Sequence, residues 1–168
     1  KEDDPTNPLG VYGASKWAGE EAIKAVGGKF YILRTSWVYS DIGHNFYLTM
    51  KRLSEKRDEI RVVSDQFGVP TSNLFIAKQT KKMINQLTSE NVGIYHLVPD
   101  GQSSWYEFAK QIITKTTPAF DINNILPVDT DQYPTNAKRP KSSVLDNSLI
   151  KTVFMLKFDD WKTELRKL

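Results

Sequence analysis

The 168-residue sequence contains no cysteine and only two histidines, His44 and His96. Without cysteine there are no disulfides, thiol nucleophiles, thiolate zinc sites or iron–sulfur clusters. Two histidines far apart in the sequence do not predict a structural zinc site. The sequence also lacks an H-E-x-x-H helix, an EF-hand loop, a Walker loop and a G-x-S-x-G elbow. We therefore expect no resident metal, and most familiar catalytic motifs are excluded.

Long apolar runs and blocks of like charge are missing as well. No apolar run approaches the ~18 residues of a membrane-spanning helix. The net charge of +3 comes from 23 basic and 20 acidic residues that are interleaved along the chain. The longest basic cluster, at residues 138–141, has the composition of a solvated loop rather than of a nucleic-acid contact. We expect a cytoplasmic protein whose partners include neither membrane nor nucleic acid.

What is present is the composition of one globular unit. The chain is 39% hydrophobic and 26% charged, and its length predicts about one domain over residues 1–168. It opens on Lys1 and an acidic, proline-bearing stretch at residues 2–5, which is typical of the middle of a loop. We therefore expect the sequence to be a piece of a longer chain.

Helical and strand patterns alternate along most of the sequence. Helices are predicted at residues 8–26, 45–56, 74–87, from 103 onward, 146–151 and 159–168, and strands at 30–39, 60–63, 93–98 and 125–128. Residues 65–71 are rich in turn-forming residues and are expected to lie in a surface loop. Strands separated by helical segments predict an α/β fold with a mainly parallel sheet.

The chemistry centres on Tyr12 and Lys16, which stand four residues apart on the first predicted helix. This spacing places the phenol and the ammonium on the same helix face. A nearby lysine cation stabilises a phenolate, and so suits a tyrosine to acid–base work near neutral pH. Small Gly13 and Ala14 would let a cofactor ring approach. The spacing alone is common in helices, so its context decides its meaning.

That context resembles the dTDP-4-dehydrorhamnose reductases, which belong to the extended short-chain dehydrogenase/reductases. The similar segments, in chain order, are P-L-G-V-Y-G-A-S-K-W-A-G-E at 8–20, L-R-T-S-W-V-Y at 33–39, N-F at 45–46, V-V-S-D-Q-F-G-V-P-T at 62–71, S-S-W-Y-E-F-A at 103–109 and R-P at 139–140. They span nearly the whole chain. The R-T-S-W-V-Y strand end and the D-Q-x-G-x-P-T loop are the most specific.

The resemblance implies an NADPH- or NADH-dependent reduction of the 4-keto group of a dTDP-6-deoxy sugar, which gives dTDP-L-rhamnose. Tyr12 would protonate the C4 oxygen as the hydride arrives, and Lys16 would hold the nicotinamide ribose. Arg34, Thr35 and Ser36 would lie where the chain passes the nicotinamide, with a role in the strand core as the alternative. Some of these reductases dimerise, so the resemblance allows a homodimer.

The resemblance also implies a set of substrate contacts. Trp37 would lie against the sugar, and Arg139 would meet the diphosphate or thymine end in two-point fashion. The remaining candidates are Asn45, Phe46, Gln66, Pro70 and Thr71. The structural alternatives are a helix cap for Asn45, a core aromatic for Phe46 and plain turn chemistry for Pro70 and Thr71. For Arg139 the alternative is a position in a surface loop. His44, His96, Trp105 and Tyr106 are expected to serve packing or capping.

Two features depart from the reductase pattern. The G-x-x-G-x-x-G turn that cradles the dinucleotide is absent, because the nine glycines do not have that spacing. We therefore expect the C-terminal part of a Rossmann-like sheet with a small α/β substrate region, lacking the cofactor-binding half and inactive alone. Phe75 stands where these reductases usually carry an acidic residue.

Two other functions remain open. The regulatory subunit of methionine adenosyltransferase is similar to the same reductases and acts as a binding partner. Sugar-nucleotide epimerases and dehydratases share the Tyr–Lys pair. The Tyr12 to Lys16 spacing, together with Trp37 and Gln66, favours the reductase.

Overall fold

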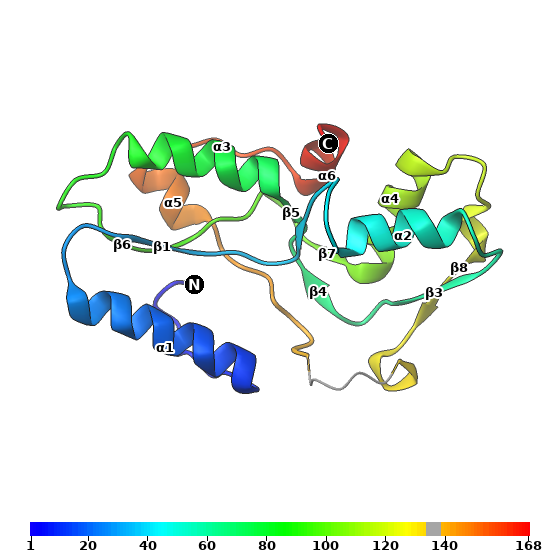
Figure 1. The fold of residues 1–168 in the computed structure, drawn as a ribbon, viewed down its shortest axis with the longest axis horizontal. Helices are drawn as coiled ribbons and strands as arrows, with labels where there is room; N and C mark the ends of the chain where they lie inside the picture. The colour runs from blue at the N-terminus through cyan, green and yellow to red at the C-terminus, as the bar shows by residue number, and fades with distance from the viewer. Residues whose placement is uncertain (134–138) are drawn as a thin grey trace.

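The structure is a computed structural model of the chain, and it describes residues 1–133 and 139–168. Helices and strands alternate over most of its length (Figure 1). In chain order the elements are α1 (Val11–Val26), β1 (Tyr31–Arg34), β2 (Val38–Tyr39), α2 (Phe46–Ser54), β3 (Ile60–Val63), β4 (Phe67–Gly68), β5 (Thr71–Ser72), α3 (Asn73–Ile84), β6 (Gly93–His96), β7 (Ser103–Ser104), α4 (Trp105–Thr116), β8 (Ile125–Val128), α5 (Ser148–Val153) and α6 (Trp161–Arg166), with short 3₁₀ turns η1 (Ile122–Asn124) and η2 (Thr130–Gln132). The predicted α/β class is confirmed.

One layer is the parallel pair β1–β6, with α1 on one face and α3 and α5 on the other (Figure 1). Alternation along β1 explains this arrangement. Tyr31 and Leu33 point into an apolar cluster with side chains from α3, α5 and β6, whereas Arg34 points towards α1. The strand therefore connects the helix that carries Tyr12 to a buried core.

A second core surrounds the parallel pair β3–β8. Helices α2, α4 and α6 pack on it, and Phe108 and Ile112 of α4 are fully buried at its centre. Phe108 contacts Tyr39 and Trp161 edge to face, at ring centroid distances of 5.1 and 5.8 Å. This core is the small α/β region that the sequence predicted.

Short strand pairs join the two cores. β2 pairs with β5 in parallel and β4 with β7 in antiparallel, so segments more than 30 residues apart meet between the layers. The amide of Phe67 donates to the carbonyl of Lys141, and the amide of Ser143 donates to the carbonyl of Phe67. The segment after residue 138 is therefore fixed beside β4.

The structure corrects two predictions. The strand expected over residues 30–39 is broken into β1 and β2, because Trp37 takes a left-handed backbone with φ of 47°. The loop expected on the surface at residues 65–71 is mostly buried, and it includes β4 and the start of β5. Its backbone groups are paired with distant segments, which allows burial.

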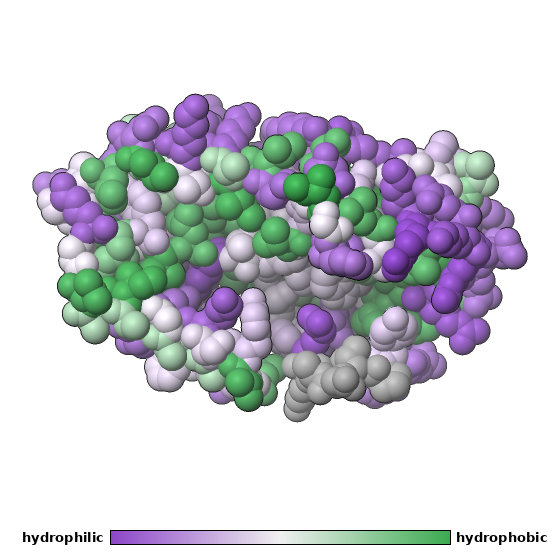
Figure 2. Space-filling model, in the orientation of Figure 1, coloured by the Kyte–Doolittle hydropathy of each residue, from purple (hydrophilic) through white to green (hydrophobic). Residues whose placement is uncertain are grey.

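Helix α1 differs from the other long helices in having no buried residue. Apolar side chains stand exposed along it: Val11, Tyr12, Trp17, Ile23 and Val26. Figure 2 shows hydrophobic colour over this helix. No helix of the part that the structure describes is long and apolar enough to cross a membrane.

Candidate functional site

Tyr12 and Lys16 lie on the first two turns of α1. The Nζ atom of Lys16 is 5.5 Å from the centroid of the Tyr12 ring, and the phenol is 78% exposed. A Cβ at Gly13 would lie 3.1 Å from Cβ of Pro8, so the glycine lets the preceding chain pass close to the helix start. The two groups are adjacent, as their spacing predicts, and both are open to an approaching molecule.

The same spacing occurs twice more, at Tyr47 and Lys51 on α2 and at Tyr106 and Lys110 on α4. There the Lys110 Nζ lies 5.2 Å from the Tyr106 ring centroid, so the local geometry is almost the same. Tyr106 is half-buried against the second core, whereas Tyr12 is exposed. Tyr47 is buried as well. Spacing on a helix therefore does not by itself make a site, and the surroundings must distinguish the three pairs.

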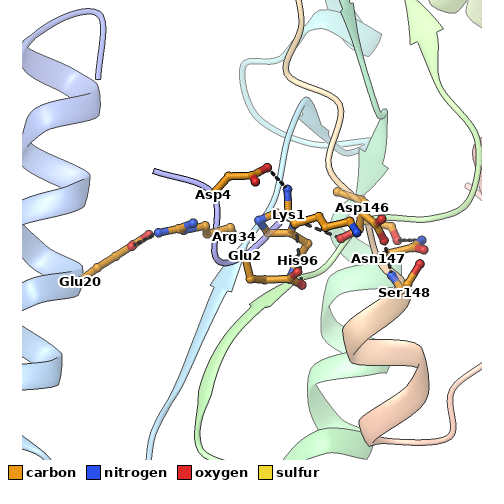
Figure 3. Close-up of polar contacts among 10 residues, drawn as sticks. Lys1, Glu2, Asp4, Glu20, Arg34, His96, Asp146, Asn147 and Ser148 are labelled. Atoms are coloured by element: carbon orange, nitrogen blue, oxygen red, sulfur yellow. Dashed lines mark hydrogen bonds and ion pairs between the residues drawn. The ribbon is translucent and has the colours of Figure 1, made fainter. Parts of the chain in front are cut away.

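An ion pair fixes the orientation of α1 relative to the sheet. Arg34 donates two hydrogen bonds to the Glu20 carboxylate, of 2.9 Å from Nε and 2.6 Å from Nη2 (Figure 3). Both side chains are largely shielded, with 20% and 15% exposed. The hydrogen bond from Arg34 holds the pKa of Glu20 below its usual value. Two nitrogens of Arg34 are thus committed to Glu20, and its expected contact with the nicotinamide stays a prediction.

A second polar group anchors the segment that leads into α1. The Glu2 carboxylate accepts a hydrogen bond of 2.9 Å from the His96 amide, and Nδ1 of His96 lies 3.0 Å from the carbonyl of Asp146 (Figure 3). Burial lowers the pKa of His96. A neutral imidazole protonated on Nδ1 donates to Asp146 and satisfies this arrangement. His96 therefore serves packing and hydrogen bonding, as expected.

Trp37 lies at the junction of the two cores. Its indole stacks on Trp105 with ring centroids 3.7 Å apart and planes 12° apart, and Phe46 packs against Trp105 at 4.5 Å. A left-handed backbone at a bulky residue costs on the order of 1–3 kcal/mol and needs surrounding structure to hold it. The two predicted aromatics, Trp37 and Phe46, are thus brought together through Trp105.

The loop at residues 65–71 is held by internal contacts. Gln66 is buried, and its Nε2 donates to the Thr130 hydroxyl at 3.1 Å. That hydroxyl and the Thr130 amide donate to Asp65, which lowers the pKa of Asp65. The Thr71 hydroxyl donates to the Val69 carbonyl, so Thr71 makes the turn contact that was its alternative role.

The other predicted residues divide between structural and exposed positions. Ser36 exchanges two hydrogen bonds with the backbone of Val69, and Asn45 caps α2 by accepting from the Leu48 amide at 3.2 Å. Thr35 and Arg139 are exposed, and Pro70 is buried. Lys138 lies outside the described residues. The substrate and cofactor contacts of these residues remain predictions.

Sequence reasoning missed several partners of the site residues. It assigned Trp105 to packing and did not connect it to Trp37. The pairs Glu20–Arg34 and Glu2–His96 were also missed. The two residues are 14 positions apart in the first pair and 94 in the second, and no local pattern indicates such contacts.

Two hollows in the described part of the surface lie away from this site. One of about 480 Å³ is lined by α3, and another of about 520 Å³ lies between the end of α2 and η1. Neither includes Tyr12, Lys16 or Trp37. Among the described residues, no three His, Asp or Glu side chains gather as a metal site would require. The exposed pair on α1 and the aromatic cluster at Trp37 are therefore the candidates for binding or catalysis.

The chain is similar to known reductases in sequence and in fold. The dTDP-4-dehydrorhamnose reductases of Burkholderia thailandensis and Escherichia coli K12 are 38% and 39% identical to the chain, over 96% and 99% of its length. The crystal structure of the Bacillus anthracis dTDP-4-dehydrorhamnose reductase in complex with NADP superimposes with a TM-score of 0.90 at 37% identity, and covers 99% of the chain.

The match extends over only part of these relatives. The chain spans 58% of the length of the two curated reductases and 57% of the crystallised one. The RmlD substrate binding domain matches residues 1–168, which is the whole of the sequence. The chain belongs to the RmlD substrate-binding domain family.

Proposed function

We propose that this chain is the substrate-side part of an NAD(P)H-dependent reductase that converts dTDP-4-dehydrorhamnose to dTDP-L-rhamnose. The observation that carries the proposal is the exposed Tyr12–Lys16 pair, 5.5 Å apart, in a chain whose reductase relatives match it almost end to end. The Tyr–Lys pair on α4 is half-buried and lies outside the proposed site, and in the pair on α2 the tyrosine, Tyr47, is buried.

The residues present fit a nicotinamide cofactor at α1. The Tyr12 phenol and the Lys16 ammonium are adjacent and exposed, and Thr35 lies exposed at the end of β1. When bound, the reduced nicotinamide supplies a hydride to the sugar C4. The G-x-x-G-x-x-G cradle for its phosphates is not in this sequence, so we propose that another part of the polypeptide supplies it and that these 168 residues alone are inactive.

The proton transfer belongs to this chain. As the C4 carbonyl becomes an alkoxide, the O–H bond of Tyr12 breaks and a new O–H bond forms at the sugar. The phenolate that remains is stabilised by the Lys16 cation beside it, and it regains a proton from water. Lys16 also holds the ribose hydroxyls of the cofactor through its ammonium protons.

The substrate lies, in this proposal, between α1 and the junction of the two cores. Trp37 forms an apolar wall for the deoxy sugar, with Phe46 and Gln66 nearby. Arg139 binds the diphosphate through its planar guanidinium. The segment that carries Arg139 is tied to β4 by the backbone bonds between Phe67 and residues 141 and 143, which brings it to the same junction.

Isotope transfer tests the reaction. The complete polypeptide is incubated with dTDP-4-dehydrorhamnose and NADPH that carries deuterium on the transferred position, and the sugar product is examined by mass spectrometry and NMR. We expect one deuterium at C4 for each NADPH consumed. Product formed without net consumption of NADPH would indicate an epimerase or dehydratase, and folded protein that binds cofactor but forms no product would favour a regulatory binding role.

A further inference from the structure

Trp37 is held in an unusual conformation by contacts on several sides. Its φ of 47° lies in the left-handed region, which bulky residues seldom adopt. The Thr71 amide donates to the Trp37 carbonyl at 3.2 Å, and the preceding Ser36 exchanges two hydrogen bonds with Val69. The backbone on both sides of the indole is therefore fixed to the buried loop at residues 65–71.

Trp105 covers one face of the indole. The two rings are nearly parallel, 12° apart, at a centroid distance of 3.7 Å. Trp105 is itself rigidly placed, because it is the first residue of α4, whose N-cap Ser104 accepts a hydrogen bond from the Glu107 amide at 3.1 Å. Phe46 and Phe108 pack beside it. Trp105 thus gives Trp37 a fixed surface that belongs to the second core.

Gly68 supplies the space for the indole. A Cβ at this position would lie 2.6 Å from Nε1 of Trp37 and closer still to Cε2, and it would lie 2.8 Å from Oγ of Ser143. The φ of Gly68 is not in the left-handed region, so the backbone there does not require glycine. Pairing of Gly68 with Ser103 in β4–β7 holds this strand in place. The glycine is therefore needed because the indole, and on another side the Ser143 hydroxyl, approach it closely.

We propose that Trp105 and Gly68 are positioning residues that hold the Trp37 indole as a pre-formed wall for the deoxy sugar of the nucleotide-sugar substrate. The proposal rests on the proposed function for the identity of the ligand. The new element is that two residues, Trp105 and Gly68, contribute to substrate recognition through their contacts with Trp37. A wall fixed before binding spares the substrate the cost of ordering the side chain.

The test uses Gly68→Ala and Trp105→Leu in the complete polypeptide. We expect each to raise KM for the dTDP-sugar about tenfold, because an aromatic contact is misplaced, while kcat changes much less. Trp105→Tyr keeps an aromatic face and should restore most of the affinity. In a Trp37→Phe background, Gly68→Ala should have little further effect, since the clash is then reduced.

A spectroscopic measurement separates this proposal from the proposed function. The indole N–H resonance of Trp37 is identified by its loss in Trp37→Phe. It should move in Trp105→Leu and Gly68→Ala, and stay in place in Trp17→Phe, which changes an exposed tryptophan on α1.

The outcomes are distinct. Wild type without turnover would overturn the proposed function, but shifts of the Trp37 resonance would still support the positioning role. An unmoved resonance together with an unchanged KM in both variants would overturn the positioning role. If Trp105→Leu does not fold, Gly68→Ala serves as the disrupting variant and Trp105→Tyr as the variant that keeps the aromatic face.

Discussion

The Arg34 guanidinium and the Glu20 carboxylate form a two-point ion pair that joins β1 to α1. Glu20 lies two helical turns beyond Tyr12, on a helix that has no buried residue of its own. The pair is therefore a principal polar link between α1 and the sheet. Its loss should loosen α1 more than the rest of the fold.

Glu20→Gln should lower the free energy of unfolding by about 1–2 kcal/mol at pH 7, because Arg34 is left with a weaker, neutral acceptor. Urea unfolding measures the change. Glu21→Gln is the matched control, since Glu21 pairs with Lys24 in its own helix and is about half exposed. An equal loss in both variants would contradict a special role for the Glu20–Arg34 pair.

The same pair predicts a pH dependence. Folding lowers the pKa of Glu20 below its usual 4.5, so its stabilising contribution is present above about pH 4.5 and is lost as the pH falls through the folded-state pKa. The difference between wild type and Glu20→Gln should be constant from neutral pH down to this range and shrink below it. A difference that does not change with pH would argue against the ion pair.

Ser72→Ala should destabilise the fold by about 1 kcal/mol, because the Ser72 hydroxyl caps α3 by accepting from the Phe75 amide at 3.1 Å. Ser72 is 1% exposed, so water cannot replace the lost bond. Ser72→Thr keeps the hydroxyl and should recover most of the loss. Exposed Ser89→Ala serves as the control in the same denaturation series. Equal midpoints for all three variants would refute the cap.

Met155→Gly should stabilise the protein. Met155 follows α5 with φ of 49°, and the amide of Leu156 donates to the carbonyl of Lys151, which is the hydrogen bond of a Schellman motif. Glycine removes the cost of about 1–2 kcal/mol that a non-glycine residue has in the left-handed conformation. Its greater freedom in the unfolded chain lowers the stability by less than this amount. The Met155 side chain is 86% exposed, so little packing is lost. A thermal midpoint below that of wild type would contradict the prediction, and Met155→Ala should change it little.

Arg139→Ala should raise KM for the dTDP-sugar roughly 10- to 100-fold, because charge-assisted hydrogen bonds to the diphosphate would be lost. The free energy of unfolding should not change, since Arg139 is exposed. Arg166→Ala, at an exposed position on α6, controls for general charge effects. Equal KM values in the two variants would remove Arg139 from the site.

The sequence predicted the local elements well where one periodicity dominates. Strands were predicted at Ile60–Val63 and Ile125–Val128 with the bounds that the structure has, because short β-rich runs there end at polar turns. The adjacency of Tyr12 and Lys16 followed from helix geometry alone. These features depend on neighbours within one turn or one strand.

The sequence could not predict features that depend on distant contacts. Residues 30–39 have the pattern of one continuous strand, whereas the break at Trp37 accompanies contacts with the distant residues Thr71 and Trp105. Burial of residues 65–71 depends on backbone pairing of Phe67 with residues more than 70 positions away. Turn-forming composition indicates where the chain bends, and it does not reveal what packs over the bend.

We propose above all that Tyr12 is the acid of a sugar-nucleotide reductase. The most direct test measures NADPH oxidation with dTDP-4-dehydrorhamnose by the complete polypeptide, as wild type and as the variants Tyr12→Phe and Tyr106→Phe. Tyr106 is the matched control, because it has the same spacing to a lysine on another helix. We predict that Tyr12→Phe lowers kcat by on the order of 10²–10⁴-fold, while Tyr106→Phe keeps nearly full activity. Activity retained in folded Tyr12→Phe would contradict the account.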